Sequence, residues 1–335
     1  MPSTIHDVAR LAGVSSSTVS KYINGGSLRP KNRLKVQQAI EQLDFKPNTV
    51  ARSLKSNRTY SVGVILPSLS NTFCATVISA FEKELQKNGY GVLLCDCAED
   101  PKAELTCAQF LLDKKVDGIV NMPLSESPEF LPLFQESNIP VVLIDQKPSD
   151  CVCDTVLVDN FDASYKAVEH LIKLHHEKIA IICGDQERFT ANERLTGYLH
   201  ALQDYNIPIC EEYIHHCNYR AESGYHIVKS LMRLPMPPTA IFATSYDLTL
   251  GTVTALNELG LSIGKDISLI GFDGLALSNI IRPHLSMVTQ PMEEIGQRAA
   301  TLLLQRIQGD YSDFPCVERL KTTFITAASV QNMRP

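Results

Sequence analysis

Short apolar runs alternate with helical patterns along most of the chain, and this alternation limits the folds available to it. An apolar run at residues 61–66 precedes a helical pattern at residues 72–88, and the same order recurs as far as residue 272. Strands separated by helices pair in parallel, and the helices cover both faces of the sheet. Two such series predict an α/β fold with two doubly wound, Rossmann-like lobes and a ligand site between them.

The expected elements fall into two groups. In the first, strands are expected at residues 61–66, 91–95, 118–121 and 141–144, and helices at residues 72–88, 101–114 and 128–137. In the second, strands are expected at residues 178–183, 239–243 and 267–272, and helices at residues 163–174, 193–205, 221–234 and 248–259. Because 335 residues exceed one ordinary core, two or three domains are expected.

The N-terminal residues differ from the rest in charge. Residues 1–60 contain ten Lys or Arg and three Asp or Glu, a net charge of +7, so the remainder of a chain of charge −6 carries −13. A basic segment on an acidic body is typical of a nucleic-acid-binding module joined to another domain. A basic surface without such a partner is the alternative that charge alone leaves open.

Residues 4–25 show the pattern of two short helices joined by a turn. Thr4 can cap the first helix within a Thr-x-x-Asp box, and Gly13 permits a left-handed turn after it. Ser15 is a natural cap for the second helix. Two helices joined in this way form a helix-turn-helix, whose second helix reads DNA.

The second helix is expected to have a buried and an open face. Val19 and Ile23 lie one turn apart on the buried face. A third helix near residues 32–43 would close the small core with Leu34, Val36, Ile40 and Leu43. The open face of the second helix carries Ser16, Ser17, Ser20 and Lys21.

This three-helix head resembles that of the LacI/GalR family of bacterial transcription regulators. The matching pattern is T-I-x-D-V-A-x-x-A-G-V-S-x-x-T-V-S-[RK]-x-[LI]-N-G, read from Thr4 to Gly25. Residues 45–54 are similar to the family's hinge helix, Y-x-P-N-x-x-A-R-x-L, in which Pro47 ends the preceding helix. The resemblance implies that Leu54 wedges between base pairs in the minor groove.

The resemblance also implies a set of DNA contacts. Ser16, Ser17 and Lys21 match the family's base-reading positions. Lysine, where the family usually has arginine, pairs with guanine or phosphate but lacks the planar fork of arginine. The implied DNA-binding residues are Thr4, Ser16, Ser17, Thr18, Ser20, Lys21, Asn24, Asn48, Ala51, Arg52 and Leu54.

The body resembles the periplasmic-binding-protein-type core of the same family. The matches are Leu66-Pro67-x-x-Ser70-Asn71-x-Phe73, Val116-Asp117-Gly118-Ile119, Ile144-Asp145, Val158-Asp159-Asn160, Arg194-x-x-Gly197-Tyr198 and Gly271-Phe272-Asp273. In that fold the chain crosses between lobes more than once. The implied domains are residues 1–46 (helix-turn-helix), 47–60 (hinge helix and linker), 61–160 with 290–318 (N-terminal effector-binding lobe) and 161–289 with 319–335 (C-terminal effector-binding lobe).

By the same resemblance, side chains from both lobes contact an effector. Phe73 would cover a sugar or base ring, although packing between helix and cleft is an equal alternative, and Arg194 and Asp273 would bind hydroxyls. Tyr246 stands where the family usually has an acid, with Asp247 one position late, so their contact with ligand is left open. The implied effector-binding residues are Ser70, Asn71, Phe73, Asp145, Asn160, Arg194, Tyr246 and Asp273.

These features predict a ligand-responsive regulator. We expect a homodimer that represses carbohydrate or related metabolic genes, binds a palindromic double-stranded DNA operator and takes a sugar or sugar derivative as effector. The ten cysteines lack zinc or redox spacing, so neither metal nor cofactor is expected. Without a signal-peptide or membrane-spanning apolar run, we expect a cytoplasmic protein. The alternative, a sugar or nucleoside kinase or hydrolase with a DNA-binding head, lacks a Walker A, G-x-S-x-G or H-E-x-x-H motif in the sequence.

Overall fold

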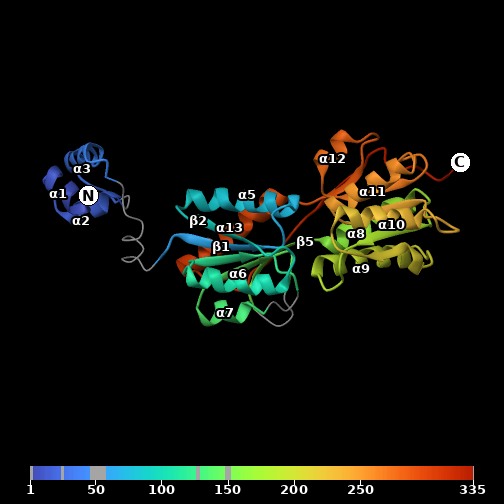
Figure 1. The fold of residues 1–335 in the computed structure, drawn as a ribbon, viewed down its shortest axis with the longest axis horizontal. Helices are drawn as coiled ribbons and strands as arrows, with labels where there is room; N and C mark the ends of the chain where they lie inside the picture. The colour runs from blue at the N-terminus through green and yellow to red at the C-terminus, as the bar shows by residue number, and fades with distance from the viewer. Residues whose placement is uncertain (1–2, 24–25, 46–57, 126–128, 148–151, 335) are drawn as a thin grey trace. The chain divides into compact units, whose positions relative to one another are not determined.

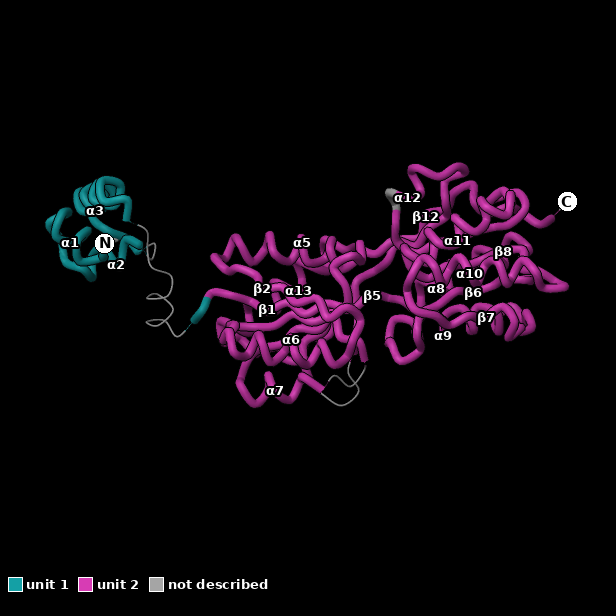
Figure 2. Tube along the Cα trace, in the orientation of Figure 1, with its two compact units in different colours: residues 1–59 teal, residues 60–335 magenta. Residues whose placement is uncertain are grey.

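The computed structural model describes residues 3–23, 26–45, 58–125, 129–147 and 152–334 (Figure 1). The chain divides into two compact units, residues 1–59 and 60–335, which Figure 2 colours separately. Within the described ranges, no helix is both long and apolar enough to cross a membrane. The expected DNA contacts at Asn24, Asn48, Ala51, Arg52 and Leu54 lie outside the described residues.

The first unit holds three helices, α1 (Ile5–Ala12), α2 (Ser16–Ile23) and α3 (Pro30–Gln42). The capping box predicted at Thr4 is confirmed, because its hydroxyl accepts from the Asp7 amide and the Asp7 carboxylate accepts from the Thr4 amide. Gly13 adopts a left-handed conformation with φ 63°. The Ser15 hydroxyl accepts from the Thr18 amide at 3.2 Å, as expected for a cap.

The core of the first unit differs from the prediction at one residue. Val19 and Val36 are fully buried, as expected, with Ile40 partly buried beside them. Leu34 was predicted in this core, but its side chain is 58% exposed. Leu34 lies two positions from Val36, and residues two apart point to nearly opposite sides of a helix.

The first lobe of the second unit is a six-stranded parallel sheet in the order β11-β5-β4-β3-β1-β2. Its strands are β1 (Ser61–Leu66), β2 (Gly91–Asp96), β3 (Gly118–Asn121), β4 (Val141–Ile144), β5 (Asp154–Val158) and β11 (Val317–Leu320). One face is covered by α5 (Thr72–Lys87) and α13 (Met292–Gln308), and the other by α6 (Pro101–Asp113) and α7 (Leu131–Glu136) (Figure 1).

The second lobe is also six-stranded, in the order β12-β10-β9-β8-β6-β7. Its strands are β6 (Ile179–Cys183), β7 (Ile214–His216), β8 (Ala240–Ala243), β9 (Ser268–Phe272), β10 (Ser286–Thr289) and β12 (Thr323–Ile325), of which β12 pairs antiparallel with β10. Its larger helices are α8 (Asn160–Lys173) and α9 (Phe189–Asp204) on one face and α10 (Ala221–Leu231) and α11 (Tyr246–Glu258) on the other. Two short helices, η1 (Glu211–Tyr213) and α12 (Leu275–Ile280), complete it.

The chain passes between the two lobes after β5, after β10 and after β11. The first two passages lie beside the expected borders at residues 160 and 289. The third expected border, after residue 318, falls inside β11, because this strand continues in register with β5 to Leu320. The lobes are therefore joined by three neighbouring segments.

The α/β class and the two doubly wound lobes are confirmed. The sequence did not indicate β5, whose first residue, Asp154, is a fully buried acid. Arg306 of α13 compensates this charge, because its Nε and Nη2 donate to the two Asp154 carboxylate oxygens at 2.7 and 3.1 Å. A polar residue thus begins a central strand because a partner distant in the sequence pairs with it.

Glycine allows two helix pairs to pack with their backbones in close contact. A Cβ at Gly296 of α13 would lie 2.3 Å from the Val77 carbonyl oxygen of α5. A Cβ at Gly251 of α11 would lie 1.9 Å from the Ala221 carbonyl oxygen of α10. Helix α5 therefore rests directly on α13, and its N-terminal end is fixed at the boundary between the lobes.

Candidate functional site

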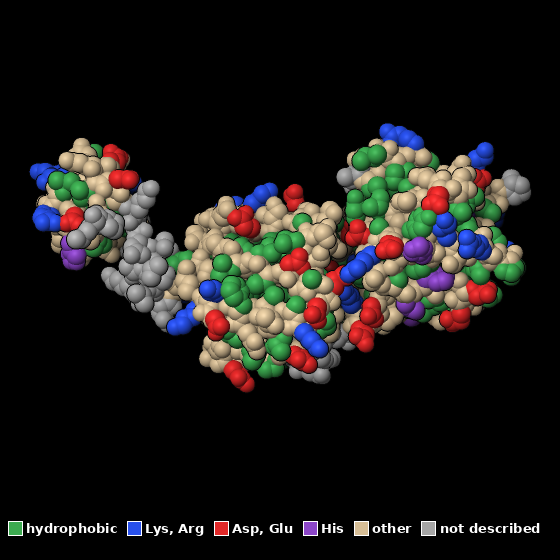
Figure 3. Space-filling model, in the orientation of Figure 1, with side chains coloured by type: hydrophobic (Ala, Val, Ile, Leu, Met, Phe, Trp, Pro, Cys, Tyr) green, Lys and Arg blue, Asp and Glu red, His purple; other side chains and the backbone are tan. Residues whose placement is uncertain are grey.

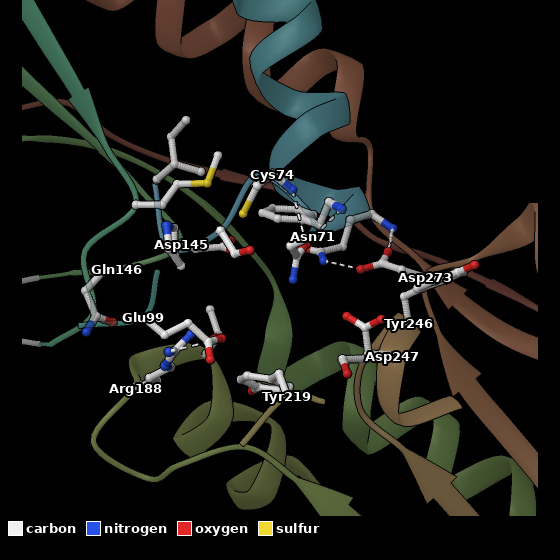
Figure 4. A pocket seen from close by; sticks show the side chains of 18 of the residues that line it. Asn71, Cys74, Glu99, Asp145, Gln146, Arg188, Tyr219, Tyr246, Asp247 and Asp273 are labelled. Atoms are coloured by element: carbon white, nitrogen blue, oxygen red, sulfur yellow. Dashed lines mark hydrogen bonds and ion pairs between the residues drawn. The ribbon is translucent and has the colours of Figure 1, made fainter. Parts of the chain in front are cut away.

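A cavity lies between the lobes, at the carboxyl ends of the parallel strands of both sheets (Figure 4). Its empty space is about 810 Å³, including the part that is open to solvent. Parallel strands place their following loops at one edge of the sheet, which is why both lobes contribute loop residues here.

Six of the eight expected effector-binding residues line this cavity. They are Asn71, Phe73, Asp145, Arg194, Tyr246 and Asp273. Ser70 does not line it, because its side chain is exposed and its hydroxyl lies 2.8 Å from that of Ser68. Asn160 does not line it either, because it is fully buried behind Arg194. Neither Ser70 nor Asn160 is therefore placed to touch a ligand in this cavity.

Asn71 and Phe73 both belong to the start of α5. The Asn71 side-chain oxygen accepts from the amides of Phe73 and Cys74, so it caps the helix. Phe73 is half-buried and packs partly against the core of the first lobe. Its ring therefore serves the packing that the sequence left as an alternative, while one edge lines the cavity.

Arg194 is fixed by the protein around it. Its Nε donates to the Asn160 side-chain oxygen at 2.8 Å, and its Nη1 donates to the Thr244 carbonyl at 2.6 Å. Its guanidinium lies 3.8 Å from the centre of the Phe272 ring. Asn160 thus acts by positioning Arg194, whose guanidinium is presented to the cavity in one orientation.

Two aspartates face the cavity from corresponding places in the two lobes. Asp145 directly follows β4 and Asp273 directly follows β9, with φ 64° and 60°. Left-handed backbone is unusual for residues other than glycine and concentrates at functional sites. Figure 4 shows both carboxylates beside the same open space.

The two carboxylates differ in their partners. Asp273 accepts from the Gln290 amide at 3.1 Å and from the Gln290 side chain at 2.7 Å. Among the described residues, nothing donates to Asp145 Oδ1, which is buried. Burial raises the pKa of Asp145 to about 6. The positive charge of Arg194 lowers this pKa, and the negative charge of Asp273 raises it further. Burial also raises the pKa of Asp273.

Tyr246 and Asp247, whose contact with ligand the sequence left open, both line the cavity from the first turn of α11. In the described part of the chain, no hydrogen bond or ion pair engages the Asp247 carboxylate. Burial raises the pKa of Asp247, and the charge of Glu99 raises it further. Asp247 is therefore a carboxylate whose acceptors are available to a ligand.

Sequence reasoning missed several lining residues. Their shared feature is position, because each follows the carboxyl end of a strand, where open α/β sheets bind ligands. That rule, applied to every predicted strand, would have pointed to most of them. The missed residues include Glu99 after β2, Arg188 and Thr190 after β6, Tyr219 after β7, and Gln290 after β10.

The described residues contain no group of three or more His, Cys, Asp or Glu side chains that could hold a metal ion. The nine described cysteines are free thiols. One of them, Cys74, lines the cavity, and burial raises its pKa to about 12, so it is not a reactive thiolate.

The first unit presents a second candidate site on α2. Lys21 and Ser17 are exposed, as expected for groups that reach DNA. The Ser16 hydroxyl lies 3.1 Å from His6 Nδ1, and the Ser15 hydroxyl lies 2.8 Å from that of Ser17. Two of the predicted reading positions are therefore held by neighbouring polar groups and would exchange these bonds for contacts with DNA.

The other predicted head residues have mainly local partners. The Thr4 side chain is engaged in the capping box, and the Thr18 hydroxyl lies 2.8 Å from that of Ser15. Ser20 lies on the same helix and is half-buried. The exposed face of α2 is consequently hydroxyl-rich with a single lysine, a surface suited to polar contacts in a DNA groove.

Comparison with known proteins relates both sites to one family. Residues 59–326 match the model for periplasmic binding proteins and the sugar binding domain of the LacI family, and residues 4–48 match that for bacterial regulatory proteins of the lacI family. The chain is 35% identical to the HTH-type transcriptional repressor PurR of Actinobacillus pleuropneumoniae serotype 3 (strain JL03), over 98% of this chain and 99% of that one.

Two solved structures are similar over long stretches. A Lac repressor dimer bound to operator and an anti-inducer has a TM-score of 0.87 at 26% identity and covers 99% of this chain and 100% of its own. A LacI family regulator from Enterococcus faecium with bound ribose has a TM-score of 0.74 at 29% identity and covers 82% of this chain and 100% of its own. These proteins are transcription regulators rather than enzymes. The chain belongs to the LacI family of bacterial transcription regulators.

Proposed function

We propose that the protein is a homodimeric repressor that binds a near-palindromic operator and changes its affinity for DNA when a small molecule occupies the interlobe cavity. The observation that carries this proposal is the presence, in one chain, of a helix-turn-helix with an exposed hydroxyl-rich face and a cavity between the lobes that is lined by carboxylates, one of which has a buried oxygen without a donor. The Lac repressor, a similar protein, is a dimer on its operator. The activity belongs in the cytoplasm, where bacterial DNA lies.

We propose that the effector is uncharged and rich in hydroxyl groups, with a sugar as the first candidate. The carboxylates of Asp145, Asp247 and Asp273 line the cavity and accept hydrogen bonds from hydroxyls. Arg194 donates from its fixed position, and the Phe73 edge covers part of a ring. The relative with bound ribose supports this class of ligand.

Binding of the effector changes DNA affinity only if it prefers one arrangement of the lobes. The cavity meets this condition, because its ligand-facing groups come from both lobes. Asp145 belongs to the first lobe, and Arg194 and Asp273 to the second. A molecule that contacts all three side chains favours the arrangement in which they converge.

Operator binding is tested with the full-length protein and duplexes that it selects from a random library. In gel-shift titrations at about 0.15 M salt, we expect a clear preference for a selected palindrome over its scrambled sequence. Lys21→Ala should weaken binding to the palindrome, whereas Lys102→Ala, which removes an exposed lysine of α6, should not. Equal binding to palindrome and scrambled duplex would refute the proposed function.

The effector class is tested by thermal shift against ribose, glucose, cellobiose and adenosine. A compound that binds the folded state raises the melting temperature, and at a fixed concentration a tighter ligand raises it more. We expect stabilisation by at least one neutral hydroxylated compound, and that compound should alter the gel-shift midpoint for the palindrome. A compound that stabilises the protein without changing this midpoint would contradict its role as effector.

A further inference from the structure

Glu99 links the two lobes across the mouth of the cavity. It belongs to the loop after β2 in the first lobe, whereas Arg188 and Arg220 precede α9 and α10 in the second. Glu99 Oε1 lies 4.0 Å from Arg188 Nη2, and Glu99 Oε2 lies 3.5 Å from Arg220 Nη2. Figure 4 shows Glu99 beside Arg188 at one side of the open space.

The loop that carries Glu99 holds it in place. Ala98 and Glu99 both have left-handed backbone, with φ 51° and 60°. The Asp96 carboxylate accepts from the Ala98 amide at 2.8 Å, and the Glu99 amide donates to the Pro67 carbonyl at 2.9 Å. Two successive non-glycine residues in this conformation persist only where the surroundings enforce it, so the direction of the Glu99 side chain is built into the loop.

Arg188 lines the cavity, and Arg220 approaches the same Glu99 carboxylate from outside the lining. Two neighbouring arginines would ordinarily attract an anion. Guanidinium groups donate pairs of hydrogen bonds to phosphate and carboxylate oxygens. Arg188 and Arg220 both lie close enough to Glu99 to donate to an anionic group in its place. Here the carboxylate of Glu99 already faces both of them. Glu99 is therefore an internal counter-ion to the two arginines. Its carboxylate occupies the place where the phosphate or carboxylate group of an anionic ligand would otherwise bind.

We propose that Glu99 determines effector specificity: by neutralising Arg188 and Arg220 from the opposite lobe, it admits uncharged ligands and excludes phosphorylated ones. The inference rests on the proposed function of the cavity as an effector site. Other charges act in the same direction, since Asp145, Asp247 and Asp273 line the cavity as well. A phosphate group would have to displace Glu99 and then remain close to these three carboxylates.

The ion pairs of Glu99 serve selectivity more than stability. Side-chain exposure is 25% for Glu99, 25% for Arg188 and 65% for Arg220, and partly exposed pairs at these distances contribute little to folding. Removing the charge of Glu99 should therefore leave the protein folded. It should, however, leave the guanidinium of Arg188, which lines the cavity, and that of Arg220 beside it without their counter-ion.

The test compares the full-length protein with Glu99→Gln, which keeps the size of the side chain and removes its charge. The probes are ribose, ribose 5-phosphate and inorganic phosphate, measured by calorimetric titration and thermal shift. For Glu99→Gln, we expect affinity for ribose 5-phosphate and inorganic phosphate to rise at least about tenfold over the natural protein. Reversal of this gain in the double variant Glu99→Gln, Arg220→Gln would assign it to the arginine pair.

Glu193→Gln is the matched control. Glu193 of α9 pairs with Arg319 of β11 at 2.9 Å, so it also joins the lobes, but it does not line the cavity. It should gain no phosphate binding. An equal gain in phosphate affinity in Glu193→Gln would overturn the proposal. The proposal would also be overturned if the natural protein and Glu99→Gln bound phosphate with the same affinity, whether both bound it strongly or neither bound it detectably.

The outcome is separable from the proposed function. Phosphate titrations are made without DNA, whereas operator preference is measured by gel shift. A natural protein that prefers no palindrome would refute the regulatory role even if Glu99→Gln gained phosphate affinity. A protein with operator preference but no phosphate gain in Glu99→Gln would overturn only the role of Glu99.

Discussion

Asp145 combines two costly features, a left-handed backbone and a buried carboxylate oxygen that no described group donates to. Burial raises its pKa from 3.8 to about 6. The folded protein therefore binds this proton more tightly than the unfolded chain does. As pH rises from about 4 to about 6, the stability of the ligand-free protein falls, and the full loss persists at neutral pH.

Asp145→Asn should therefore stabilise the ligand-free protein at about pH 7.5 by roughly 3 kcal/mol, and by less than about 1 kcal/mol at about pH 4. Asparagine keeps the shape of the side chain and tolerates left-handed backbone, so the charge is the main change. Denaturant unfolding at the two pH values measures the difference.

Asp113→Asn is the control for this prediction, because Asp113 is exposed at the end of α6 and undergoes the same chemical change. It should alter stability little at either pH. A stabilisation by Asp145→Asn of the same size at both pH values would show that ionisation of Asp145 is not its cause.

At the residue scale, the sequence predicted the cavity only in part. Asp145 and Asp273 were expected because their segments match motifs of the family, and the structure places both at the cavity. Asn160 matched a motif but lies behind Arg194, which local sequence does not reveal. Glu99 was missed because the rule of loops after strands was not applied to the segment after residues 91–95, and no glycine marks the left-handed backbone that directs its side chain.

The contact between α5 and α13 is an element-scale feature that joins segments far apart in the sequence. Gly296 lets the two helix backbones approach, and buried side chains such as Phe81 and Leu303 fill the core beneath them. Because Asn71 and Phe73 begin α5, the same contact also positions one wall of the cavity.

Gly296→Ala should destabilise the protein by roughly 1–3 kcal/mol. In an open helix the same change would favour folding by about 1 kcal/mol. Here the new Cβ would lie 2.3 Å from the Val77 carbonyl oxygen, so the helices must move apart. Urea unfolding measures the change.

Gly91→Ala provides the comparison, since a Cβ at Gly91 meets nothing within 4 Å and the residue is exposed. It should change the unfolding free energy by a few tenths of a kcal/mol at most, as surface substitutions usually do. If Gly296→Ala proved as mild as Gly91→Ala, the two helices would not be in the close contact that the structure describes.

At the element scale, most strands and helices could be predicted, because their apolar periodicity is local information. The expected elements did not include β5, β7, β10, β11, β12, η1, α12 or α13, and two of these omissions have non-local causes. Strand β5 begins with Asp154, which is buried only because Arg306 reaches it from α13. The antiparallel edge strand β12 follows the last passage between lobes, and no local pattern marks its direction.

At the scale of the whole molecule, the two units have separate cores. The core of the first unit is drawn from residues 8–45, and those of the second unit lie within residues 62–307. The visible face of residues 60–335 carries acidic and basic side chains interspersed (Figure 3). Damage to the small core should therefore affect DNA binding without affecting ligand binding.

Val19→Ala should lower the stability of the first unit by roughly 2 kcal/mol, a large share for a core of this size. Affinity for the selected palindrome should fall accordingly. The melting of residues 60–335 and its shift with a stabilising sugar should stay unchanged. Gel shift measures the operator affinity, and calorimetry measures the melting.

Leu34→Ala is the matched control in the same unit. Its side chain is 58% exposed, so its removal should leave both measurements close to those of the natural protein. A change in the sugar-dependent melting shift on Val19→Ala would contradict the separation of the two units.

The three segments that join the lobes restrict how the molecule can respond to a ligand. They follow β5, β10 and β11. Three connections of this kind favour rotation of one lobe against the other over separation of the lobes. An effector of the proposed kind would therefore select an angle between two lobes that stay joined, and its signal would be geometric in nature from the moment it binds.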